Sequence, residues 1–189
     1  MRDIVRFAIT LTIVSFISAC SLALINEITK SEILSREQKN LNNALMYVLP
    51  GSNSTSILPI QKEGQFLYYK GYEDQKRTKI VGYAFLVESQ GYTNSIRTLV
   101  GIDTSGSILR IKIVSQQETP GLGARCEEIQ NGESIPWWQA QFQNKSAVDI
   151  AVDKDGGQIE SISGATITSR AITDGIANRT KKLFETIHE

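Results

Sequence analysis

The sequence predicts an α+β protein, in which an antiparallel sheet and a few helices follow one N-terminal transmembrane helix. Three observations carry this prediction. Residues 7–25 are apolar and uncharged, residues 65–114 contain strand-like segments separated by turn residues, and residues 165–187 repeat apolar side chains at helical spacing. Strands grouped together and followed by a helix are typical of α+β domains.

The first element is the uncharged run at residues 7–25, FAITLTIVSFISACSLALI. As a helix it would extend roughly 29 Å, close to the thickness of a bilayer core of about 30 Å. Arg2 and Arg6 precede it, and basic residues before a span favour a cytoplasmic N-terminus. We therefore expect a single-pass anchor at residues 1–26 in the cytoplasmic (inner) membrane, with the rest of the chain on the extracytoplasmic, or periplasmic, side.

Three other interpretations of this run remain open. A cleaved signal peptide usually has a shorter apolar region, of about 7–15 residues. The residues 17–20, Ile-Ser-Ala-Cys, resemble a lipoprotein box ending at Cys20, although residues 21–25 stay apolar beyond it. A buried core helix is disfavoured because the segment is apolar on all sides.

A second helical segment is expected at residues 27–50. Apolar side chains recur there at three- and four-residue steps, and Pro50 with Gly51 ends the pattern. We interpret residues 27–50 as a stalk and residues 51–189 as the folded domain.

Strands are expected at residues 65–70, 79–89, 95–103 and 107–114. The last two flank Thr104-Ser105-Gly106 and indicate a hairpin. In its second arm, alternation predicts that Leu109, Ile111 and Ile113 point inward.

The remaining elements are less regular. Residues 115–132 lack periodicity, and Trp137 and Trp138 follow Pro136 in a short helical piece. Residues 148–152 suggest a strand, with 158–161 as its continuation or partner. Residues 165–187 predict a closing helix with one apolar face.

Charge and composition exclude several kinds of chemistry. Lys plus Arg and Asp plus Glu are balanced at 20 each, so a nucleic-acid partner is not expected. Cys20 and Cys126 give no metal or iron–sulfur spacing. The single histidine, His188, lies next to the C-terminus. We predict no metal site and no catalytic residue in this chain, so any redox chemistry must come from a bound cofactor.

The segment Ser163-Gly164-Ala165-Thr166 lies where strand gives way to the closing helix. Ser163 could cap the helix, Gly164 allows close approach of a ligand, and the free N–H groups of a first turn favour an anion. Thr166 and Thr168 place hydroxyls at the same end. On residue types alone, a plain Ser/Thr-rich cap is the favoured interpretation of this stretch, because such caps are common.

Residues 160–166, Glu-Ser-Ile-Ser-Gly-Ala-Thr, resemble the flavinylation motif of the FMN-binding domain family. The resemblance implies that Thr166 accepts flavin mononucleotide (FMN) through a phosphoester bond, made by a separate flavin transferase from FAD. Thr168 is the alternative acceptor. The family usually has Asp where this chain has Glu160, which keeps the charge but lengthens the side chain.

A second block, residues 117–123 (Gln-Glu-Thr-Pro-Gly-Leu-Gly), resembles the segment that lies near the flavin in the same family. Pro and two Gly residues favour a sharp, stiff loop. The resemblance implies the following cofactor-binding residues: Glu118, Thr119, Gly121, Leu122, Gly123, Ser163, Gly164, Ala165, Thr166 and Thr168.

The family includes the G subunit of the Rnf complex and the C subunit of the sodium-pumping NADH:quinone reductase. Overall length and the continuation at residues 167–170 resemble the Rnf G subunit more closely. The resemblance implies an electron carrier in an ion-translocating ferredoxin:NAD oxidoreductase, with other membrane subunits, a flavin transferase and the lipid bilayer as partners. The alternatives are a quinone-reductase C subunit and a membrane-anchored assembly module without redox function.

Four further residues have open roles. Trp137 and Trp138 could stack near the flavin or simply fill a core or an interface. Cys126 suits a small apolar filler. Arg125 could pair with a flavin or with a carboxylate of a partner, although a lone Arg usually remains solvated.

Overall fold

The computed structural model describes residues 2–62, 65–130 and 132–188. Its first element is one unbroken helix, α1 (Arg2–Val48), so the expected anchor and stalk belong to the same helix. The chain divides into two compact units, Met1–Leu41 and Asn42–Glu189. In the first unit, large apolar side chains such as Leu11 and Phe16 are exposed, and the helix is long and apolar enough to cross a membrane.

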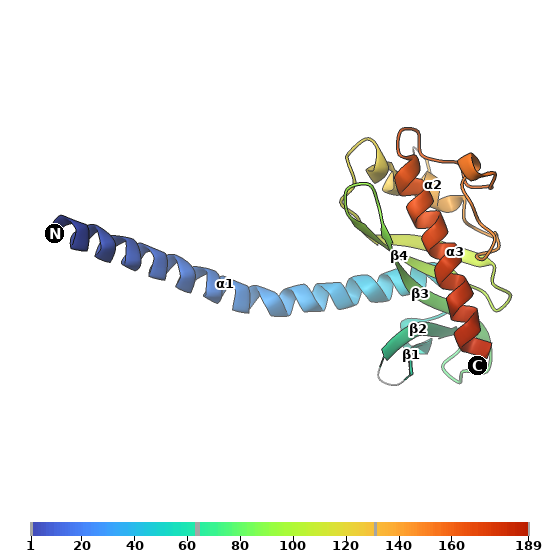
Figure 1. Cartoon of the computed structure of the whole chain (residues 1–189). Helices are drawn as coiled ribbons and strands as arrows, with labels where there is room; N and C mark the ends of the chain where they lie inside the picture. The colour runs from blue at the N-terminus through green and yellow to red at the C-terminus, as the bar shows by residue number, and fades with distance from the viewer. Residues whose placement is uncertain (1, 63–64, 131, 189) are drawn as a thin grey trace. The chain divides into compact units, whose positions relative to one another are not determined.

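The second unit is built on a five-stranded antiparallel sheet, which confirms the predicted fold class. Its strands follow one another along the chain in the order β1-β2-β3-β4-β5, each antiparallel to the next, and Figure 1 labels the first four. The strands are β1 (Ile57–Lys62), β2 (Gln65–Tyr72), β3 (Ile80–Gln90), β4 (Ser95–Ile102) and β5 (Ile108–Ser115). The edge strand β1 was not expected from the sequence, because Pro59, Gln61 and Lys62 obscure its alternation.

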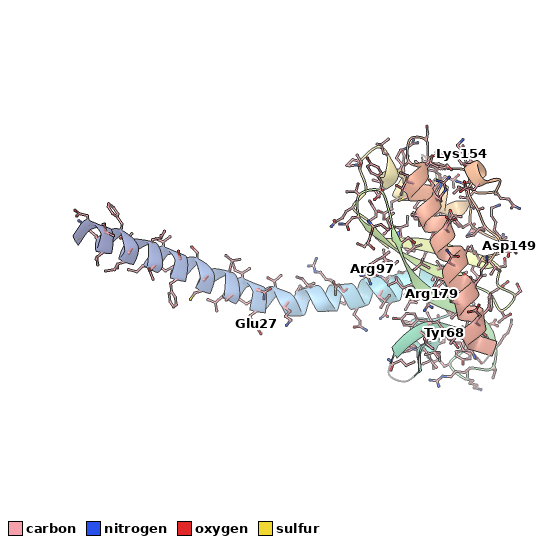
Figure 2. The ribbon with its side chains drawn as sticks, viewed as in Figure 1. Glu27, Tyr68, Arg97, Asp149, Lys154 and Arg179 are labelled. Carbon is pink, nitrogen blue, oxygen red and sulfur yellow. The ribbon has the colours of Figure 1, made fainter. Side chains whose placement is uncertain are left out.

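One face of the sheet packs against the closing helix, α3 (Thr166–His188), which lies across it in Figure 1. The core between them contains buried side chains from both elements. They include Phe85, Val100, Ile102, Ile111, Ile113, Ile172, Ile176 and Leu183. Arg179, labelled in Figure 2, donates from α3 to the carbonyl of Leu67 in β2 at 3.1 Å. This packing holds α3 in position on the sheet. The first turn of α3 belongs to the candidate site described below.

The opposite face of the sheet packs against the end of α1. Leu45, Val48 and Leu49 are buried there, together with Ala84 and Leu99 of the sheet. Two short helices, α2 (Trp137–Ala140) and the 3-10 helix η2 (Gly123–Glu127), extend the first core. The unit therefore has apolar layers on both faces of one sheet.

Two local expectations were wrong. In β5, Ile111 and Ile113 are buried, but Leu109 is only half-buried. The register shifts at Gly101/Ile102, so that Ile108 pairs with Ile102 and takes the buried position.

Residues 148–152 do not form a strand. They are irregular, and only an isolated parallel bridge joins Val152 to Ile159. The 3-10 helix η3 (Asp153–Asp155) follows directly, so no partner strand is available to extend the pairing.

Candidate functional site

The N-terminus of α3 does not have Ser163 as its capping residue, as the sequence had suggested. The helix begins at Thr166, and the residue before it, Ala165, has no side-chain oxygen. Gly164 adopts a left-handed conformation (φ +77°), and Ala165 N–H donates to the carbonyl of Ile162 at 2.8 Å. This turn places Ser163 too early in the chain to cap the helix. The expectation that Ser163 is the N-cap is therefore wrong.

As a result, the first turn of α3 keeps free donors. The first backbone hydrogen bond into the helix is from Ser169 N–H to the carbonyl of Ala165, at 3.0 Å. Among the described residues, no acceptor faces the N–H groups of Thr166, Ile167 or Thr168. Three free N–H groups at a helix start form an anion site of the kind that binds phosphate.

The two threonine hydroxyls have different environments. Thr166 is half-buried, and its hydroxyl has no hydrogen-bond partner within the described part of the chain. Thr168 is 1% exposed and donates its hydroxyl to Oε2 of Glu118 at 2.5 Å. Only the Thr166 hydroxyl is therefore both accessible and unengaged.

The loop at residues 118–123 meets the start of α3. Leu122 N–H and Ala124 N–H both donate to the carbonyl of Thr119, and Gly121 has φ +76°, so the loop is a tight turn. Thr119, Pro120, Gly121 and Leu122 are exposed, whereas Glu118 and Gly123 are buried. The exposed part of this loop is available to a ligand, and the buried part holds it in place.

A third segment joins this site, the turn between β3 and β4. Its backbone N–H groups donate to the Glu118 carboxylate: Thr93 to Oε1 at 2.9 Å, Tyr92 to Oε2 at 3.2 Å and Asn94 to Oε1 at 3.4 Å. This turn was not predicted from the sequence as part of the site. Gly91-Tyr92-Thr93-Asn94 between two strands signals a turn, but nothing local shows that it binds a carboxylate 24 to 26 residues later.

The environment of Glu118 sets its charge. Burial alone would raise the pKa of the Glu118 carboxyl, but the Thr168 hydroxyl and the three backbone N–H groups outweigh burial. The pKa of Glu118 therefore lies below its ordinary value, and the carboxylate is ionised at neutral pH.

Glycines make this close contact possible. A Cβ atom at Gly123 would lie 2.7 Å from both Glu118 Oε2 and Thr168 Oγ1. A Cβ atom at Gly91 would lie 2.5 Å from Glu118 Oε1. Neither position has room for a side chain, so the carboxylate is enclosed by backbone.

Residues 153–162, which precede the start of α3 in the chain, are held in place by several hydrogen bonds. Trp138 Nε1 donates to the carbonyl of Glu160 at 2.8 Å, and Glu160 N–H donates to Oε1 of Gln141 at 2.8 Å. Asp153 accepts from the N–H and hydroxyl of Ser161, which lower the pKa of its carboxyl to about 2. Glu160 is thus held through its backbone, and its side chain is exposed.

Arg170 completes this fastening. Its guanidinium donates two hydrogen bonds to the Asp155 carboxylate, at 2.6 and 2.7 Å. Lys154, the neighbour of Asp155, is labelled in Figure 2 and lies in the same loop. Arg170 lies on α3, about one helical turn after Thr166. The ion pair therefore links this loop to the first part of the helix.

The residues with open roles can now be placed. Trp138 and Cys126 are buried in the core, and burial raises the pKa of the Cys126 thiol to about 12, so it is protonated and unreactive at neutral pH. Trp137 is half-buried and does not enter this hydrogen-bond set. Arg125 pairs with Glu128 at 2.9 Å rather than pointing to the site.

Comparisons with known proteins agree with this geometry. A model of the FMN-binding domain matches residues 91–181, which begin at the turn that binds Glu118 and end within α3. The G subunit of the proton-translocating ferredoxin:NAD(+) oxidoreductase complex of Clostridium ljungdahlii is 34% identical, over 90% of this chain and 87% of its own length. The chain belongs to the family of G subunits of ion-translocating oxidoreductase complexes.

Other members of this G-subunit family show the same extent of similarity. The G subunit of the ion-translocating oxidoreductase complex of Pasteurella multocida is 30% identical over 97% of this chain and 95% of its own length. The G subunit of the Na(+)-translocating ferredoxin:NAD(+) oxidoreductase complex of Acetobacterium woodii is 29% identical over 93% of this chain and 89% of its own length. A crystal structure of Shewanella oneidensis NqrC covers 71% of this chain and 72% of its own, with a TM-score of 0.46 and 15% identity.

The residues of the site show whether it can hold the phosphate group of FMN. A phosphate group needs donors and an approach free of side chains. The start of α3 offers three unengaged N–H groups beside the half-buried Thr166 hydroxyl. The residues present therefore fit the phosphate of FMN.

Proposed function

We propose that this chain is the electron-carrying G subunit of a membrane-bound ferredoxin:NAD oxidoreductase that translocates ions. We further propose that FMN is attached to Thr166 by a phosphoester bond. The observation that carries the attachment site is the unengaged, half-buried Thr166 hydroxyl beside three free N–H groups.

Each part of the site has a role in this proposal. The N–H groups of Thr166, Ile167 and Thr168 hold the phosphate and neutralise part of its charge. The exposed loop Thr119–Leu122 lies alongside, where its backbone and the Leu122 side chain limit the positions of the ring. When bound, FMN supplies one- and two-electron chemistry, while the chain itself binds and orients it.

Attachment is a group transfer with FAD as the donor. The Thr166 oxygen forms a bond to the phosphorus of the FMN half, and the bond between the two phosphates breaks. AMP leaves with the electron pair of that bond, and the proton of the hydroxyl is released to solvent. A separate flavin transferase performs this step.

The same proposal covers location and partners. The apolar, solvent-exposed first unit would cross the cytoplasmic membrane once, with Arg2 and Arg6 on the cytoplasmic side and the sheet domain outside. A cofactor tethered on that side cannot diffuse away. Electrons would pass to and from redox centres in neighbouring membrane subunits, since this chain binds no second cofactor in the proposal.

Intact mass tests the attachment. The full chain is co-expressed with a flavin transferase, purified in detergent and weighed. We expect a gain equal to FMN minus one water in the wild type and in Thr166→Ser, which keeps a hydroxyl, and none in Thr166→Val. A wild-type chain that gains no mass with active transferase and FAD contradicts the proposal. Identification of co-purified membrane subunits then tests its place in the complex.

A further inference from the structure

We propose that Glu118 is a positioning residue that does not contact the flavin, and that it reserves Thr166 as the acceptor by engaging the neighbouring Thr168 hydroxyl. This inference rests on the proposed attachment of FMN at Thr166. It assigns Glu118 a different role from the cofactor contact that the sequence motif suggests.

The acceptor capacity of Glu118 is already filled. Oε1 accepts from the N–H groups of Thr93 and Asn94, and Oε2 accepts from Tyr92 N–H and the Thr168 hydroxyl. An ionised carboxylate offers about four lone-pair sites, two on each oxygen. Four donors leave none for a flavin N–H or a ribityl hydroxyl.

Space leads to the same conclusion. Glu118 is 6% exposed, and Gly91 and Gly123 approach its carboxylate so closely that no added methyl group would fit. A ring or a water molecule is larger than a methyl group or comparable to it. The carboxylate is therefore screened from a ligand that lies over the exposed part of the loop.

The contacts join three segments that are far apart in the chain. The turn at residues 91–94, the loop at 118–123 and the first turn of α3 all meet at one ionised group. Hydrogen bonds to a charged group are stronger than neutral ones. Glu118 therefore fixes the loop and the helix start relative to each other, and so fixes the space around Thr166.

The same contacts distinguish the two threonines. Residues two apart on a helix point to nearly opposite sides. Thr168 points inward to Glu118, whereas Thr166 is half-buried with an unengaged hydroxyl. A hydroxyl whose proton is held by a buried carboxylate cannot reach a transferase active site.

The test compares two variants of Thr168, one that keeps the hydroxyl and one that removes it. Thr168→Ser keeps the hydroxyl that donates to Glu118, and Thr168→Val keeps the shape but removes it. Full-length chains are incubated in detergent with flavin transferase and FAD, and flavin attachment is followed by in-gel flavin fluorescence. We expect Thr168→Ser to match the wild type and Thr168→Val to be slower by about tenfold, the effect of one hydrogen bond to a charged group.

Glu118→Gln and Glu118→Asp complete the experiment. We expect Glu118→Gln to slow attachment by at least about tenfold, because an amide N–H₂ would face donors. We also expect peptide mapping of Glu118→Gln to find part of the FMN on Thr168, a change that a general loss of stability does not produce. Glu118→Asp should restore attachment at Thr166 alone, though more slowly.

The outcomes separate this inference from the proposed function. If the wild type takes no FMN, the proposed function itself is contradicted. If the wild type takes FMN at Thr166 and both Thr168→Val and Glu118→Gln match its rate and site, Glu118 is no positioning residue. Tryptophan fluorescence, which reports on the domain through Trp137 and Trp138, shows that each variant is folded.

Discussion

The side chain of Leu122 lies against the backbone of Gly164, so that a Cβ atom at position 164 would come within 3.0 Å of Leu122 Cδ2. These two residues come from the two sequence blocks that resemble the flavin-binding family. Their contact shows that the loop and the helix start form one continuous surface beside Thr166. A ligand attached at Thr166 therefore lies next to the exposed part of the loop.

Replacing Gly164 by Ala should disturb this surface. Gly164 has φ +77°, where an L-residue is strained by about 1–2 kcal/mol, and the new methyl group would also push Leu122 away. We expect a loss of roughly that much unfolding free energy and a marked loss of FMN attachment. Urea unfolding followed by tryptophan fluorescence, together with intact mass, measures both.

Gly156→Ala is the matched control. Gly156 has φ +81°, and a Cβ atom there would have no neighbour within 4 Å among the described residues. This variant should lose similar stability but attach FMN normally. If Gly164→Ala attaches FMN as fast as Gly156→Ala, the Leu122 contact has no role in presenting Thr166.

The hydrogen bond from Trp138 to Glu160 yields a second prediction. Trp138→Phe removes the N–H that donates to the Glu160 carbonyl and leaves a small void in a fully buried position. We expect a loss of about 1–3 kcal/mol in unfolding free energy. We also expect faster amide hydrogen exchange in residues 158–162, because the segment loses one of its fastenings.

The adjacent tryptophan offers the comparison. Trp137 is half-buried, and its ring lies near the Arg125 guanidinium at 6.0 Å rather than against the motif. Trp137→Phe should leave exchange in residues 158–162 unchanged. Equal exchange in the two variants would show that the Glu160 carbonyl does not depend on Trp138.

The sequence was sufficient for the parts of this fold that depend on short-range pattern. Apolar and aromatic runs separated by turn residues predicted β2 to β5, and helical spacing predicted α3 to within a residue or two. Failures came where tertiary contacts decide: the bulge at Gly101/Ile102 turned Leu109 aside, and residues 148–152 found no neighbouring strand. Sequence periodicity cannot predict the bulge or the missing strand, because each depends on which segment packs beside it in the folded domain.

Some features of the candidate site could likewise be predicted from the sequence, and others could not. Both blocks and Thr166 could be recognised from residue types and resemblance. The hydrogen bonds of Glu118 could not, because its partners lie 24 to 26 residues earlier at Tyr92, Thr93 and Asn94, and 50 residues later at Thr168. The cap was misassigned because the left-handed turn at Gly164 adds residues between Ser163 and the helix.

A third prediction concerns the contact between the end of α1 and the sheet. A Cβ atom at Gly101 would lie 2.0 Å from the carbonyl oxygen of Val48, which is backbone and cannot rotate away. Gly101→Ala should therefore displace the end of α1 and lower the unfolding free energy by roughly 1–3 kcal/mol or more. Urea unfolding in detergent measures this loss.

Gly71→Ala provides a graded control on the same face. There the nearest atom to a new Cβ is Leu49 Cδ1 at 2.8 Å, which belongs to a side chain that can move. We expect a smaller loss than for Gly101→Ala. A larger loss at Gly71 would mean that the Val48 backbone is not the rigid element in this contact.

The last prediction concerns acid stability and Asp153. The Ser161 hydroxyl, despite an opposing effect of desolvation, and then the Ser161 N–H and Lys154 hold the pKa of this carboxyl at about 2, below the ordinary aspartate value of about 3.9. A depressed pKa means that the folded state binds the proton less readily than the unfolded state. The contribution of Asp153 to stability is therefore complete above about pH 4 and is lost as the pH falls towards 2.

Two variants isolate this contribution from those of other carboxylates. Asp155, Glu118 and Asp103 also have lowered pKa values, so the wild type loses stability in acid for several reasons. In Asp153→Asn the loss between pH 4 and pH 2 should be smaller than in the wild type, because one titrating group is absent. In Ser161→Ala the carbon-13 signal of the Asp153 carboxyl should titrate nearer the ordinary value. An unchanged midpoint in Ser161→Ala would show that the Ser161 hydroxyl does not stabilise the ionised form.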